Sequence, residues 1–103
     1  MAKRFVDVFA EQQRVIILQM LNEDNDCKLN NLIIQKGLAA FGHNVSLDKV
    51  NTECAWLEDQ GLVSIDDLDG RVKIVTITQA GLDVANGSRI VPGIDRPVTI
   101  KGF

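Results

Sequence analysis

The sequence is poor in the side chains that build catalytic and metal sites. It has one histidine, two cysteines and no tyrosine in 103 residues. Metal sensing needs several Cys, His or carboxylate ligands at close spacing, and nucleophilic catalysis needs a Cys or Ser beside a base. Cys54 falls on the apolar face of an expected helix, whereas Cys27 and His43 fall in separate turns. We therefore expect no enzyme, no metal site and no other cofactor.

Long apolar runs and an excess of basic residues are also missing. No apolar run exceeds four residues, as in the segment 15–18, and about 20 are needed to span a bilayer. Asp7 and Glu11 interrupt the region where a signal peptide would be apolar. We expect a cytoplasmic protein with no membrane partner and with free thiols. The net charge of −3 gives no overall attraction to nucleic acid.

The residues that are present have the pattern of three helices, a β hairpin and a short fourth helix. The expected segments are helices over 5–21, 31–41, 47–60 and 79–86 and strands over 62–65 and 72–77. Asn30, Ser46 and Thr78 precede the last three helices and have side chains that favour N-caps. Asp69-Gly70 is typical of a hairpin turn. The order predicts an α+β fold.

Two motifs connect this order to a known architecture. Residues 56–63, W-L-E-D-Q-G-L-V, resemble the L-E-x-x-G-L-V that links the recognition helix to the wing in ArsR-like and MarR-like regulators. Residues 77–81, I-T-Q-A-G, resemble the L-T-x-x-G that follows the wing in the same families. The resemblance implies a winged helix-turn-helix with a two-stranded wing, and we place this domain over residues 1–86. The apolar residues and turn signals that follow predict an extended arm over residues 87–103.

A second resemblance extends over nearly the whole chain. Residues 56–58 (W-L-E), 81–87 (G-L-D-V-A-N-G) and 91–97 (V-P-G-I-D-R-P) are similar to a small family of winged-helix proteins encoded in Mu-like phages and prophages. Its members are labelled ArsR-like by fold. The resemblance implies a phage or prophage origin. Together with the winged-helix fold, it leads us to expect a phage-related DNA-binding transcriptional regulator that acts without catalysis. The alternative is an assembly module that uses the fold to bind other phage proteins.

The third helix is the expected recognition helix, and its outward side is acidic. At 100° per residue, Asp48, Thr52, Ala55 and Asp59 lie opposite the apolar face. From residue 46 to residue 70, seven carboxylates oppose one lysine, a local net charge of −6. This disfavours phosphate contacts. If double-stranded DNA is bound, we expect the contacts to come from Lys49, Asn51, Thr52, Arg71 and Lys73.

Apolar residues in the arm and on the helices favour a protein partner. The arm could fold back on its own domain or cross to a second subunit or a phage protein, and we favour the crossing because the first helix is also unusually apolar. Trp56 either packs at a helix edge or anchors an interface. We expect a homodimer. The expected partner-binding residues are Trp56, Ile90, Val91, Ile94, Val98, Ile100 and Phe103.

Overall fold

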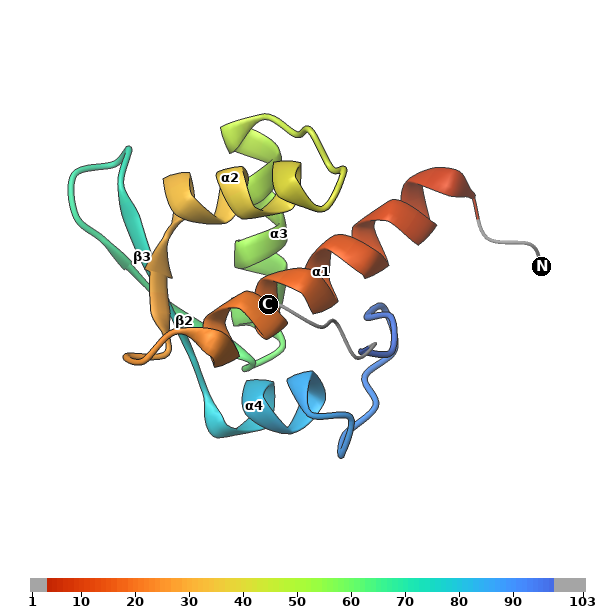
Figure 1. Ribbon diagram of the computed structural model, residues 1–103. Helices are drawn as coiled ribbons and strands as arrows, with labels where there is room; N and C mark the ends of the chain where they lie inside the picture. Colours follow the sequence, from red (N-terminus) through yellow and green to blue (C-terminus); the bar gives the residue numbers. More distant parts are fainter. Residues whose placement is uncertain (1–3, 98–103) are drawn as a thin grey trace.

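The helices pack around one another and against a small sheet in the computed structural model, which describes residues 4–97 (Figure 1). The elements are α1 (Phe5–Glu23), β1 (Lys28–Asn30), α2 (Asn31–Ala40), α3 (Leu47–Asp59), β2 (Val63–Asp67), β3 (Lys73–Ile77) and α4 (Gln79–Ala85). This is the α+β winged helix-turn-helix fold that the sequence predicts. α3 holds the position of the recognition helix, and the β2–β3 hairpin is the wing.

The sheet has one strand more than the predicted two-stranded wing. Its order is β1-β3-β2 and both pairings are antiparallel, with Val75 opposite Leu29 on one side and Ile65 on the other. β1 is three residues long and has one apolar residue between two polar ones. Such a segment shows too little alternation to be recognised, and pairing with β3 fixes it as a strand.

The predicted N-caps are confirmed. Asn30 Oδ1 accepts from the amide of Ile33 at 2.8 Å, which satisfies one of the free amides at the start of α2. Ser46 Oγ accepts from Lys49 N at 3.1 Å, and Thr78 Oγ1 accepts from Gly81 N at 3.2 Å. The first residues of α2, α3 and α4 therefore follow directly from their capping residues.

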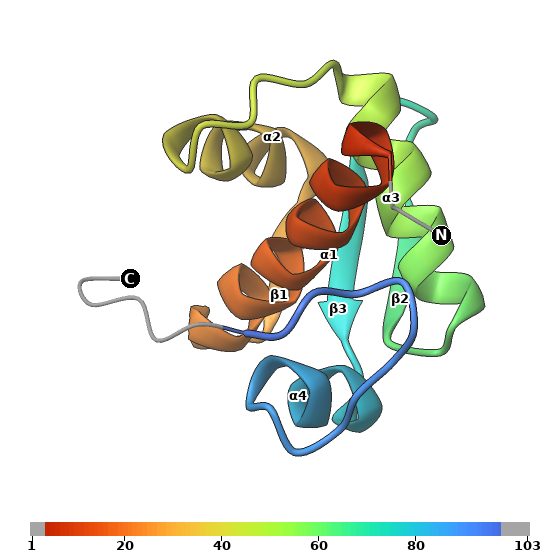
Figure 2. The same cartoon turned by 90° about the vertical axis from the view of Figure 1, so that its right-hand side faces the viewer.

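The two halves of α1 have opposite environments. Ile17, Leu18 and Leu21 are fully buried, and the second half of the helix lies among α2, α3 and α4 (Figure 2). In the first two turns, however, Phe5 is 81% exposed and Phe9 is 51% exposed. The apolar run in the second half thus forms the core of its own domain, while the apolar residues at the N-terminal end project from it.

The described part of the arm, residues 87–97, folds back along α1 (Figures 1 and 2). Ile94 is buried in the core, Val91 packs against it, and Asp95 N donates to Glu11 O at 3.2 Å. Ile90 remains exposed. Three of the predicted partner-binding residues, Val98, Ile100 and Phe103, lie outside the described residues.

Candidate nucleic-acid interface

The outward face of α3 is arranged as its periodicity predicts. Val50, Cys54 and Leu57 are buried, and the opposite side of the helix is exposed from Asp48 to Asp59. Thr52 is exposed in the middle of this face, and its hydroxyl donates to Asp48 O at 2.9 Å. Its oxygen keeps lone pairs that can accept a further hydrogen bond. The face therefore has an uncharged centre and acidic ends.

Asn31, a residue that the sequence did not single out, holds the wing beside α3. Its side chain is fully buried, and its Nδ2 donates to Asn51 Oδ1 at 2.9 Å and to Arg71 O at 3.0 Å. Its Oδ1 accepts from Lys73 N at 3.1 Å. One amide thus fixes three of the five predicted DNA-binding residues relative to one another. We call this set of contacts the Asn31 node.

The predicted cations are less available than the sequence suggests. Lys49 Nζ lies 2.5 Å from Glu53 Oε2, and Lys73 Nζ lies 2.8 Å from Asp67 Oδ2. Arg71 is exposed near the end of the turn that joins β2 to β3. Two of the three cations in the predicted set therefore already neutralise carboxylates of this chain.

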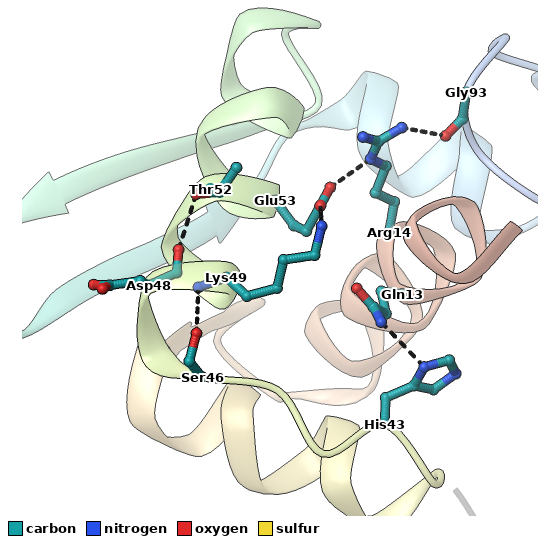
Figure 3. Close-up of polar contacts among 9 residues, drawn as sticks. All are labelled: Gln13, Arg14, His43, Ser46, Asp48, Lys49, Thr52, Glu53 and Gly93. Atoms are coloured by element: carbon teal, nitrogen blue, oxygen red, sulfur yellow. Dashed lines mark hydrogen bonds and ion pairs between the residues drawn. The ribbon is translucent and has the colours of Figure 1, made fainter. Parts of the chain in front are cut away.

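Glu53 is buried and belongs to an ionic cluster rather than to the surface (Figure 3). Its Oε1 accepts from Arg14 Nε at 2.6 Å, and its Oε2 pairs with Lys49. The guanidinium of Arg14 also donates to Gly93 O at 2.8 Å. We call this cluster the Glu53 node. It removes one carboxylate from the acidic surface counted above, because two cations of the chain compensate its charge.

Trp56 is covered by the arm and by Arg14. The Arg14 guanidinium carbon lies 3.9 Å from the centre of the Trp56 ring, within cation–π range. Gly93 has a φ of +95°, and a Cβ added there would lie 2.8 Å from Trp56 Cζ2. A glycine is therefore required both by the backbone conformation and by the space. The structure places Trp56 at an internal contact between α3 and the arm.

The wing turn uses its carboxylates to order its own backbone. Asp67 Oδ1 accepts from Gly70 N at 2.6 Å, and Asp69 Oδ1 accepts from Arg71 N and Val72 N. The hydrogen bond from Lys73 and the Gly70 amide lower the pKa of Asp67. The amides of Val72 and Arg71 lower the pKa of Asp69. Two of the acidic residues in the turn therefore have a structural role.

The thiols and the histidine do not converge. Both cysteines are free, and burial together with the nearby charge of Glu53 raises the pKa of Cys54 to about 12. His43 lies in the loop that joins α2 to α3, and its ring contacts the side chains of Gln12 and Gln13 in α1. Within residues 4–97, no three His, Cys, Asp or Glu side chains gather in a way that could hold a metal ion. None of the helices described there is long and apolar enough to cross a membrane.

Solved structures with the same arrangement place the chain among winged-helix proteins. It aligns with the complex structure of hsRosR-S1 at a TM-score of 0.60 and 25% identity, covering 74% of this chain and 65% of that one. It aligns with the complex structure of hsRosR-S4 at a TM-score of 0.60 and 23% identity, covering 79% and 71%. The chain thus spans about two thirds of these structures. No family model matches it.

Sequence comparison gives the family. The chain is 42% identical to the uncharacterized protein gp26 of Escherichia phage Mu over 91 residues, which are 88% of this chain and 93% of gp26. It is 37% identical to an uncharacterized protein of Haemophilus influenzae strain Rd over 78 residues, 76% of each chain. The protein belongs to the family of Mu gp26, which confirms the predicted relation to Mu-like phages.

Proposed function

We propose that this protein is a non-catalytic phage regulator that binds double-stranded DNA with α3 and the wing. The Asn31 node is the observation that carries the proposal. It holds the Asn51 side chain and the backbone of Arg71 and Lys73 on one buried amide, so helix and wing form a single rigid surface. Preorganisation of this kind lowers the conformational entropy that is lost when the surface binds DNA. The likeness to the hsRosR complex structures supports the same assignment.

The centre of α3 fits the edges of bases. Thr52 and Ala55 are exposed and small, so the helix can approach the floor of a major groove closely. Asn51 receives the hydrogen bond from Asn31 on Oδ1, which directs its own amide group away from that contact. An Asn amide can pair with adenine, and a carboxylate such as that of Asp48 can accept from the amino group of cytosine. The acidic end of the face is thereby compatible with base recognition.

Phosphate contacts fall to the wing. Arg71 is exposed beside the turn, and Lys73 can exchange its exposed partner Asp67 for a phosphate, since a pair of this kind contributes about 0–1 kcal/mol. Few cations are involved, so we expect weak non-specific binding and a shallow dependence of affinity on salt. Discrimination between sequences then comes mainly from α3.

The test is a titration of labelled host and prophage DNA fragments, followed by fluorescence anisotropy at about 50 mM salt. Asn51→Ala and Thr52→Ala should each reduce the preference for the best fragment by about tenfold, at the low end of one lost base contact. Arg71→Ala should weaken binding to every fragment and reduce the salt slope by about one. Arg89→Ala, an exposed arginine of the arm, is the matched control and should change neither.

A protein-binding role is the second candidate, because two of the three predicted cations are paired inside the chain and the ends of the α3 face are acidic. In that case a basic surface on another phage protein would take the place of DNA. Absence of binding to any fragment at about 50 mM salt would reject DNA recognition and favour this role. The variant Asp59→Asn, which removes a carboxylate that has no proposed base contact, is informative here. It should strengthen DNA binding in a DNA reader and leave a protein-binding module without affinity for DNA.

A further inference from the structure

The arm is connected to α3 through the Glu53 node (Figure 3). Gly93 O accepts from Arg14 Nη1 at 2.8 Å, and Arg14 Nε donates to Glu53 Oε1 at 2.6 Å. The other carboxylate oxygen of Glu53 pairs with Lys49 Nζ at 2.5 Å. A continuous line of polar contacts thus runs from the arm to one of the five residues that are predicted to bind DNA.

Lys49 is placed where it could reach a phosphate, but its charge is already used. It lies in the first turn of α3, at the end of a recognition helix that approaches DNA, and its side chain is 36% exposed. Its ammonium is held by Glu53, which is 2% exposed. A carboxylate at that depth requires compensating cations, because water does not solvate it. Transfer of Lys49 to a phosphate would leave Glu53 with Arg14 alone.

The arm fixes the second cation of the node. The Arg14 guanidinium lies between the Trp56 ring, at 3.9 Å from its centre, and the carbonyl of Gly93. Gly93 itself packs against the same ring. Only 16% of the Arg14 side chain is exposed in this arrangement. The docked arm therefore keeps the ionic cluster closed to water on the side of α3 that faces it.

We propose that the arm is an autoinhibitory element, which keeps Lys49 on Glu53 while it is docked and frees Lys49 for a phosphate when it is released. This inference rests on the proposed binding of DNA by α3 and the wing. With the arm docked, only Arg71 and Lys73 are offered to phosphates. Release of the arm adds a third cation, from the recognition helix itself.

The direction of the effect follows from solvation. Without the arm, Arg14 loses the Gly93 acceptor and its cover, and water enters the node. Glu53 is then solvated in part, and an ion pair that is open to water holds its lysine only weakly. Because linkage between two equilibria is reciprocal, a phosphate that binds Lys49 also favours release of the arm.

Gly93→Val releases the arm, and Gly42→Val is its matched control. Gly93 has a φ of +95° and an added Cβ would lie 2.8 Å from Trp56, so a β-branched side chain fits neither the backbone nor the space. Gly42 has a φ of +88°, but an added Cβ meets no other part of the chain within 4 Å. Release is measured by NMR as faster exchange of the Asp95 amide, which donates to Glu11 O in the docked arm. Far-UV circular dichroism checks that both variants are folded.

The first readout needs no DNA. Lysine amines are labelled with acetic anhydride and followed by mass spectrometry, with the exposed Lys36 as internal reference. Lys49 should react about threefold faster in Gly93→Val than in the parent or Gly42→Val, the ratio expected for loss of a weak ion pair. Lys73, whose carboxylate partner lies in the wing, should react equally fast in all three proteins. An unchanged or slower Lys49 in a variant whose arm is released would overturn the proposal.

The second readout is binding to a labelled non-specific duplex, followed by fluorescence anisotropy from about 50 to 300 mM salt. One added phosphate contact should steepen the slope of log affinity against log salt by about 0.9 in Gly93→Val, and tighten binding up to about tenfold at about 50 mM salt. Lys49→Ala in the Gly93→Val background should remove both gains. Gly42→Val should show neither of them.

The outcomes separate this proposal from the proposed function. DNA binding with the same salt slope in Gly93→Val and in the parent would overturn the inhibitory role of the arm alone. Absence of DNA binding by every variant would overturn the proposed function and with it the inhibitory role, whatever the labelling shows. Slow exchange of the Asp95 amide in Gly93→Val would show that the arm stays docked, and would contradict the contact that is argued to hold it.

Discussion

Two buried polar groups connect the elements of this domain, and they do so with different chemistry. The Asn31 node is neutral and joins α2 to α3 and the wing through three hydrogen bonds. The Glu53 node is charged and joins α3 to α1 and, through Arg14, to the arm. Both central side chains are almost completely buried.

The difference follows from what each node must hold. The surface proposed to face DNA is organised by a neutral amide, which loses little in desolvation and adds no further negative charge near phosphates. The arm is instead held by an ion pair that is strong only while both partners remain in place. We therefore expect the charged node to be the more sensitive of the two to the loss of one member.

Substitution of the charged centre should have the largest effect. Glu53→Gln keeps the shape but leaves Arg14 without its carboxylate at a site where 16% of the arginine side chain is exposed. We expect the free energy of unfolding to fall by about 3 kcal/mol, measured by urea denaturation. Asp59→Asn removes the same charge from an exposed position of α3. Its free energy of unfolding should differ from that of the parent protein by less than about 0.5 kcal/mol. Equal stability of the two variants would contradict the role of the Glu53 node.

Substitution of the neutral centre should cost less. Asn31→Ala removes three hydrogen bonds but leaves no buried charge, so we expect a loss of about 2 kcal/mol in the same assay. Exchange of the Lys73 amide should also accelerate, because its acceptor is lost. Asn22→Ala, which removes one exposed side-chain bond to Asn86, is the control and should change stability by less than about 0.5 kcal/mol. A slow Lys73 amide in Asn31→Ala would show that the wing is fixed by other contacts.

The smallest effect on stability should come from the acidic turn of the wing. Its carboxylates, Asp67 and Asp69, belong to neither node. The pKa values of Asp67 and Asp69 are lower in the folded chain than the ordinary value of 3.8. Their contribution to stability is therefore complete above pH 3.8 and disappears as the pH falls through the lower, folded pKa values. NMR titration of the carboxyl carbons should show both midpoints below 3.8. Amide exchange at Gly70 and Val72 should accelerate in acid, and midpoints at the ordinary value would contradict these hydrogen bonds.

Local signals in the sequence were sufficient for most of the fold. The capping residues and helical periodicity predicted α2, α3 and α4 within a few residues, because both signals act over one or two turns. β1 was missed, because its identity as a strand comes from pairing with β3, more than 40 residues away. Non-local pairing of a three-residue segment leaves almost no trace in its own sequence.

The candidate site was predicted less completely. The exposed face of α3 followed from its periodicity, but Asn31 was one of two adjacent asparagines, and Glu53 was counted with the surface acids. Arg14 pairs with Glu53 from a position 39 residues earlier in the chain, and no local pattern in the sequence indicates that contact. Glu53 lies beside Cys54 at the edge of the apolar face of α3. A helical projection alone does not tell whether a charged residue in that position is buried or exposed.

The stacking of Arg14 on Trp56 gives the molecule a built-in optical probe. Trp56 is the single tryptophan of the chain, and the chain has no tyrosine, so its emission is free of competing fluorophores. The indole lies against Arg14 and Gly93, at the place where the arm meets α3. Any event that moves Gly93 away from the indole exposes the ring to water and shifts the emission maximum of Trp56 to longer wavelength. Docking and release of the arm can thus be followed in real time, without a label.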